Sequence, residues 1–138
     1  MVNKKFKFLE HTADVKFQAF GKTIEQVFVN SALAEKETIC GKKKILSKIK
    51  KEIKVTGKDN ESLLYNFLEQ FLYLLDAEDF LLNKIKAIKI VNGKLKATCL
   101  GDSAKKYKFR NSVKAVTYNE MFVKKDKNPW ISQVVLDV

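Results

Sequence analysis

The residues from Leu63 to Leu75 carry an apolar pattern that restricts the fold more than any other feature of the chain. Large apolar side chains recur there at helical spacing, and they are Leu63, Leu64, Phe67, Leu68, Phe71, Leu72 and Leu75. A helix with so wide an apolar face must bury it. Asp59 or Asn60, at the turn before this segment, can cap its first turn. The pattern therefore predicts a helix that lies on a sheet or on another helix.

A second helix is predicted over residues 23–36. Thr23 and Gln26 have the spacing of a capping box, in which each side chain bonds a backbone N–H of the other. Apolar residues then follow at helical spacing, and they are Ile24, Val27, Phe28 and Ala32. We interpret this stripe as a core-facing side of the helix and assign it no binding role.

Several segments alternate apolar and polar residues, which is typical of half-buried strands. They are residues 4–9, 14–20, 51–56, 84–91, 94–100, 113–123 and 130–138. Asn92-Gly93 lies between two of them and indicates a hairpin, because both turn positions need a positive φ. We therefore predict one α+β domain over residues 1–138, with a mostly antiparallel or mixed β-sheet and two amphipathic helices packed on it.

The charge is strongly basic, with 27 Lys and Arg against 16 Asp and Glu among 138 residues and a net charge of +11. Such a field attracts polyanions. Basic residues gather at 42–51 and 105–110. One hypothesis is an independent RNA-binding module; the alternative is that these lysines are ordinary solvated surface residues.

The cysteines and the hydrophobic pattern bear on where the protein resides. Cys40 and Cys99 form no C-x-x-C pair and are too few for a disulfide scaffold. One histidine among so few thiols does not suit a zinc site. Neither a signal peptide nor an apolar run of membrane-spanning length is evident. We expect a cytoplasmic protein with reduced thiols and no membrane association.

The carboxylates of the chain are better candidates for a functional site than its cysteines and its histidine. Asp14 lies at the junction of the first two predicted strands, and Asp137 adjoins Val138 with its main-chain carboxylate. If these three groups meet at ~4 Å, each pair repels by about 4 kcal/mol at an effective dielectric constant of ~20. A divalent cation, a proton or nearby lysines would offset this. A metal-dependent phosphohydrolase is one hypothesis, although the sequence offers no evident base or nucleophile.

His11 and Lys114 are further candidate residues. His11 lies three positions before Asp14 and could serve as a general base with Asp14 as its partner, or make a structural hydrogen bond. Lys114 lies in a strand otherwise rich in apolar positions, where an exposed lysine is the ordinary interpretation. No phosphate-binding glycine loop accompanies them.

Motifs along the whole chain resemble those of the archease family. They are Phe8-Leu9-Glu10-His11-Thr12-Ala13-Asp14-Val15, Gly21-Lys22-Thr23-Ile24-Glu25-Gln26-Val27-Phe28, Asn30-Ser31-Ala32-Leu33-Ala34, Val113-Lys114-Ala115-Val116-Thr117-Tyr118, and Trp130 with the final Leu136-Asp137-Val138. Three positions depart from the family pattern: Lys16 replaces the usual Gly, Asn119 the usual His and Asp102 the usual Glu.

The resemblance implies an accessory protein that is not itself an enzyme. It would activate an RtcB-type RNA ligase in tRNA splicing and RNA repair, promoting guanylylation of the ligase and its repeated turnover. It implies a divalent cation, calcium in the family, with magnesium or manganese as alternatives. The ligands would be Asp14, Asp137 and Val138, and Lys114 would be a candidate for contact with the ligase. The protein would interact with tRNA or other RNA indirectly.

Overall fold

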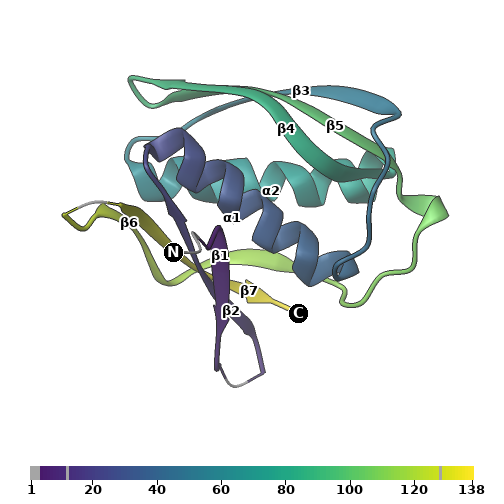
Figure 1. The fold of residues 1–138 in the computed structure, drawn as a ribbon, viewed down its shortest axis with the longest axis horizontal. Coiled ribbons are helices and arrows are strands. Elements are labelled where there is room, and N and C mark those ends of the chain that lie inside the picture. The colour runs from purple at the N-terminus through teal and green to yellow at the C-terminus, as the bar shows by residue number, and fades with distance from the viewer. Residues whose placement is uncertain (1–3, 12, 128) are drawn as a thin grey trace.

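The fold has two β-sheets with two helices packed between them (Figure 1). The computed structural model describes residues 4–11, 13–127 and 129–138. Along the chain the elements are β1 (Phe6–Leu9), β2 (Val15–Gly21), α1 (Ile24–Cys40), β3 (Ile49–Thr56), α2 (Asn60–Glu78), β4 (Phe80–Val91), β5 (Lys94–Ser103), the 3-10 helix η1 (Ala104–Lys106), β6 (Ala115–Lys125) and β7 (Trp130–Asp137).

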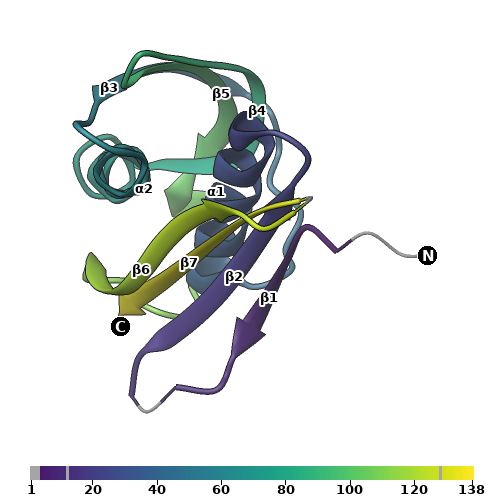
Figure 2. The ribbon, with the colours of Figure 1, turned by 90° about the vertical axis from the view of Figure 1, so that its left-hand side faces the viewer.

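Both sheets are antiparallel. One has the strand order β1-β2-β7-β6, and the other has the order β3-β5-β4. The predicted α+β class and the two amphipathic helices are confirmed. The strands divide into two sheets, which lie on opposite sides of the helical layer (Figures 1 and 2). Both helices contact strands of both sheets, which explains why the apolar stripe on α2 is so wide.

The side chains of Thr23 and Asp59 cap the two helices as predicted, but Gln26 bonds the N–H one residue before the N-cap and does not complete the predicted capping box. The Thr23 hydroxyl accepts a hydrogen bond from the Gln26 N–H at 3.1 Å, and the Gln26 side chain accepts one from the Lys22 N–H at 2.6 Å. The Asp59 carboxylate caps α2 by accepting from the Ser62 N–H at 2.7 Å. Asn92 and Gly93 have φ values of 50° and 72°, as the predicted β4–β5 hairpin requires.

Some element ends differ from the predicted ones. The first helix continues beyond residue 36 to Cys40, because Ile39 and Cys40 are buried in a second apolar cluster with Ile45 and Leu81. The same cluster and the main core explain the early start of β4, whose first residues are buried although they do not alternate. Residues 104–106, at the edge of the second basic segment, form η1.

Strand β6 is an edge strand that α2 supports through two carboxylates. Glu61 Oε2 accepts a hydrogen bond from the Val123 N–H at 2.9 Å, and Glu69 Oε2 accepts one from the Val116 N–H at 2.8 Å. Edge strands have unpaired N–H groups, and these bonds satisfy two of them. α2 is therefore joined to the four-stranded sheet by polar as well as apolar contacts. Within the described residues no helix is long and apolar enough to cross a membrane.

Candidate functional site

Asp14 and Asp137 are neighbours at one end of the four-stranded sheet. β2 and β7 pair antiparallel, and Val15 lies opposite Leu136 in that register. Asp14 directly precedes Val15, and Asp137 directly follows Leu136. In an antiparallel pair, the residues one step beyond a matched pair are the next to face each other. The end of this β2–β7 pair therefore places the two carboxylate residues beside each other.

The beginning of β6 holds Asp137 from its other side. Ala115 lies opposite Asp137, and the Lys114 N–H donates a hydrogen bond to the Asp137 backbone oxygen at 2.7 Å. Val138 follows directly and is partly exposed. Residues from three distant parts of the sequence thus meet at this end of the sheet.

Alternation along the strands gives Lys16 and Asp137 a common face. Phe17, Val134 and Leu136 are fully buried on the side of the sheet that faces the helices. Lys16 and Asp137 belong to the alternate positions, which face away from the helices, and Asp14 lies in the bend directly before β2. Asp137 therefore lies at the outer surface, and both carboxylate residues are partly exposed.

Glu120 organises the polar groups on this outer face. Its Oε1 lies 2.9 Å from Lys16 Nζ, and its Oε2 lies 3.1 Å from His11 Nε2. These bonds from Lys16 and His11 lower the pKa of the Glu120 carboxyl, with the Lys16 hydrogen bond contributing most. Lys16, whose charge departs from the family pattern near Asp14, is thus paired with Glu120.

The hydrogen-bond partner of His11 is therefore Glu120, a residue that no motif or spacing singles out. Its position depends on an irregularity in β6, where the register with β7 shifts between Thr117 and Phe122. The Gln133 side-chain amide donates to the Glu120 backbone oxygen at 2.8 Å and fixes this irregular segment. A bulge of this kind has no short sequence signature, which is why pattern analysis missed Glu120.

Two residues around the site have backbone angles that L-amino acids rarely adopt. Ala13, directly before Asp14, has φ 69°, and Glu120 has φ 56°. Non-glycine residues in this left-handed region carry a conformational cost of order 1–3 kcal/mol. Such strained residues concentrate where a structure must present particular side chains. Both lie where the chain turns to present the polar groups of the outer face.

The donor set at Asp14 and Asp137 suits a hard divalent cation. All the ion pairs found within the described residues involve other carboxylates, so no lysine or arginine there comes within 4.0 Å of either group. The described ranges also contain no cluster of three or more His, Cys, Asp or Glu side chains arranged for a metal. The expected set has two such side chains and one main-chain carboxylate, which are oxygen ligands of the kind that Ca²⁺ and Mg²⁺ prefer.

Lys114 also borders a second feature. It is exposed and is among the residues that line a hollow of about 720 Å³ between α2 and the segment before β6. Tyr73 and Phe109 line the same hollow and are 56% and 46% exposed. Exposed aromatic residues are enriched in surfaces that bind a protein partner, whereas lysines are depleted there. Lys114 thus connects this hollow to the Asp137 end of the sheet.

Asp102, which replaces the usual Glu of the family, has a structural role. The Tyr107 hydroxyl donates to its Oδ2 at 2.7 Å, and the Ser103 N–H donates to its Oδ1 at 2.8 Å. The hydrogen bond from Tyr107 is the main reason that the pKa of Asp102 is lowered. This carboxylate fixes the turn that leads from β5 into η1.

Comparisons with known proteins agree with the motifs. Residues 6–138 match the model of the Archease protein family (MTH1598/TM1083). A protein archease of Methanosarcina mazei is 37% identical over 141 residues, covering 98% of this chain and 97% of that protein. One from Sulfolobus acidocaldarius is 35% identical over 137 residues, covering 97% of this chain and 99% of the relative.

A solved structure agrees in fold as well. The solution structure of Methanobacterium thermoautotrophicum protein 1598 superposes with a TM-score of 0.83 at 31% sequence identity, covering 97% of this chain and 99% of that one. Sequence and fold are therefore shared over nearly the full length of the chain. The chain belongs to the archease family.

Proposed function

We propose that this protein is an accessory factor that activates an RtcB-type RNA ligase in tRNA splicing and RNA repair. It promotes guanylylation of the ligase and repeated turnover, and it catalyses no reaction of its own. The observation that supports this most directly is the register of β2 with β7, whose end pair, Val15 and Leu136, adjoins Asp14 and Asp137 within two of the motifs that carry the family resemblance.

In this proposal Asp14, Asp137 and Val138 hold a divalent cation, with calcium as the first choice. The bound cation supplies positive charge that offsets the repulsion between the carboxylates and orders this end of the sheet. The Lys114 N–H donates a hydrogen bond that fixes the main chain of Asp137. The Glu120 carboxylate forms an ion pair with the Lys16 ammonium. The chain's own residues thereby present one defined surface to the ligase, which includes His11 and Lys114.

The test is ligase guanylylation and multiple-turnover ligation with and without the protein. Asp14→Asn and Asp137→Asn keep the side-chain size but remove the charge, and each should lower calorimetric Ca²⁺ affinity by more than about tenfold. Both variants should also lose most of the stimulation of ligase turnover. Asp126→Asn, at an exposed turn, is the matched control and should change neither quantity.

Two outcomes would contradict the proposal. If the unmodified protein leaves guanylylation and turnover of the ligase unchanged, it is not an activator. If a C-terminal tag, which converts the Val138 carboxylate to an amide, leaves cation binding intact, then Val138 is not a ligand. Hydrolysis of phosphate esters by the protein alone with Mg²⁺ or Mn²⁺ would instead support the phosphohydrolase hypothesis.

A further inference from the structure

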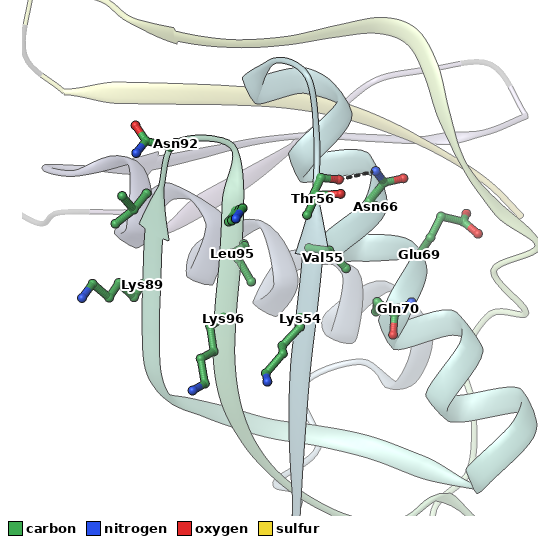
Figure 3. Close-up of a pocket in the computed structure, with 12 residues that line it drawn as sticks. Lys54, Val55, Thr56, Asn66, Glu69, Gln70, Lys89, Asn92, Leu95 and Lys96 are labelled. Carbon is green, nitrogen blue, oxygen red and sulfur yellow. Dashed lines mark hydrogen bonds between the residues drawn. The ribbon is translucent and has the colours of Figure 1, made fainter.

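Three lysines lie side by side across the β3-β5-β4 sheet. Lys96 of β5 lies opposite Lys54 of β3 on one side and opposite Lys89 of β4 on the other. Figure 3 shows these three side chains at the same level of three neighbouring strands. Adjacent strands are only about 4.8 Å apart, and like charges placed directly opposite each other destabilise a sheet. The three opposed lysines therefore concentrate positive charge here and lower the stability of the sheet.

Further lysines surround this row on the same three strands. All are exposed, and together with the row they are Lys50, Lys54, Lys84, Lys86, Lys89, Lys94 and Lys96. Ion pairs within 4.0 Å, as far as the described residues extend, involve none of them. Glu52 is the one exposed acid on these strands, and it accepts hydrogen bonds from Thr98 at 2.9 and 3.1 Å. We call this surface the lysine face.

The lysine face borders a recess. A hollow of about 920 Å³ is lined by Lys54, Lys89, Lys94 and Lys96, together with residues of α2. Glu69 is the acid in this lining, and its Oε2 already accepts the Val116 N–H at 2.8 Å. Clefts lined by one sign of charge focus the field and raise the local concentration of oppositely charged ligands. The row of lysines therefore attracts polyanions to this recess.

The chemistry of the lysine face favours phosphate groups over a folded protein. Strands β3, β4 and β5 contain one aromatic residue, Phe80, and it is buried. Protein interfaces are enriched in aromatic residues and arginine and depleted in lysine, so this face lacks the anchors of a protein-binding site. It equally lacks aromatic platforms on which bases could stack. Lysine ammonium groups remain, and they contact backbone phosphates without reading sequence.

We propose that the lysine face, centred on Lys54, Lys96 and Lys89, binds the phosphate backbone of RNA without sequence preference. The choice of RNA over DNA rests on the proposed function with an RNA ligase. The lysine face and the Asp14–Asp137 end belong to different sheets, on opposite sides of the helical layer (Figure 1). RNA held on one sheet leaves the other sheet accessible to the ligase.

The experiment compares two variants of equal net charge. One combines Lys54→Gln, Lys89→Gln and Lys96→Gln; the control combines Lys42→Gln, Lys44→Gln and Lys125→Gln at exposed positions outside the lysine face. The probe is a fluorescently labelled tRNA transcript, and its anisotropy is titrated with protein between ~50 and ~200 mM KCl. Thermal unfolding followed by circular dichroism checks that both variants fold.

The unmodified protein should bind with a linear dependence of log K on log salt. The lysine-face variant should bind at least about tenfold more weakly at low salt, with a slope reduced by about 2–3, because each lost phosphate contact removes ~0.7–0.9 from it. The control should keep most of the affinity. Equal losses in both variants, or no RNA binding by the unmodified protein, would overturn the proposal.

The test also separates this inference from the proposed function. Guanylylation of the ligase, measured with labelled GTP and no RNA, should be stimulated equally by the unmodified protein and the lysine-face variant. If neither stimulates it but the difference in RNA affinity persists, the proposed function fails and the RNA surface stands. If the lysine-face variant binds RNA normally but no longer associates with the ligase, this face docks an acidic protein and the RNA proposal is wrong.

Discussion

Replacing Lys96 with glutamine should stabilise the protein. Lys96 lies opposite both Lys54 and Lys89, whereas each of those residues has one lysine opposite it. An unfavourable cross-strand pair costs roughly 0.2–1 kcal/mol. Removing the central charge relieves two such pairs, so the free energy of unfolding should rise by roughly 1 kcal/mol at low salt. For a chain of 138 residues this raises the melting temperature by roughly 3 °C.

The matched control is Lys94→Gln. Lys94 is exposed on the same strand, but its neighbours across the sheet are Thr56 and Val91. The substitution changes the net charge by the same amount and relieves no directly opposed pair. Its effect on the free energy of unfolding should therefore stay within about 0.5 kcal/mol.

The assay is urea unfolding at low and high salt. The screening length is about 10 Å at 0.1 M salt and about 3 Å at 1 M, so the gain from Lys96→Gln should shrink strongly at high salt. In a double-mutant cycle, Lys54→Gln should add less stability once Lys96 is glutamine. A Lys96→Gln protein that is less stable than the parent, or a gain that salt leaves unchanged, would refute the repulsion argument.

Three further predictions concern buried residues. Burial, and then the charge of Glu69, raise the pKa of Glu35 well above its ordinary value, and both its carboxylate oxygens are buried without a hydrogen-bond partner among the described residues. Glu35 favours its neutral form in the fold, so stability should fall as pH rises above ~4.3, whereas Glu35→Gln should remove this decline in urea unfolding from pH ~4 to ~8. Burial, with a smaller contribution from Glu52, raises the pKa of the Cys99 thiol to about 12, so Ellman's reagent should label Cys99 at neutral pH only through unfolding. In Gly101→Ala the new Cβ would lie 2.1 Å from the Leu81 backbone oxygen, and the loss of stability should exceed about 3 kcal/mol in the same unfolding assay.

The elements themselves follow from local patterns in the sequence. The α2 stripe, the Thr23 and Asp59 caps and the Asn92-Gly93 turn all depend on residues close together in the chain, and the structure confirms them. The division into two sheets could not be derived in this way. It depends on which strands pair across 50 or more positions, as Val15 does with Leu136, and alternation alone does not identify the partner strand.

The candidate site likewise contains residues that local sequence patterns identify and residues that only the fold identifies. Asp14, Asp137 and Val138 could be named from the sequence because they lie within motifs at the junction and end of strands. Glu120 could not, because its contact with His11 and Lys16 depends on the irregular register of β6 and on a left-handed backbone angle. The row of lysines was also not predicted from the sequence, but for a different reason. Each lysine looked like an ordinary exposed strand residue, and only the pairing of three strands brings them to one level.

Glu69 connects the lysine face to the Asp137 end of the four-stranded sheet. It lines the hollow beside the lysine face, and its carboxylate holds the Val116 N–H of β6 at 2.8 Å. Val116 adjoins Ala115, which lies opposite Asp137. A hydrogen-bonded carboxylate of α2 thus ties the wall of one surface to the strand that supports the other. Because packed layers of this kind resist continuous deformation, the lysine face and the Asp137 end should keep a fixed separation. RNA bound on the lysine face and ligase bound at the Asp137 end would be separated by the helical layer. The protein would then fix the position of the RNA relative to the ligase without a site that contacts both.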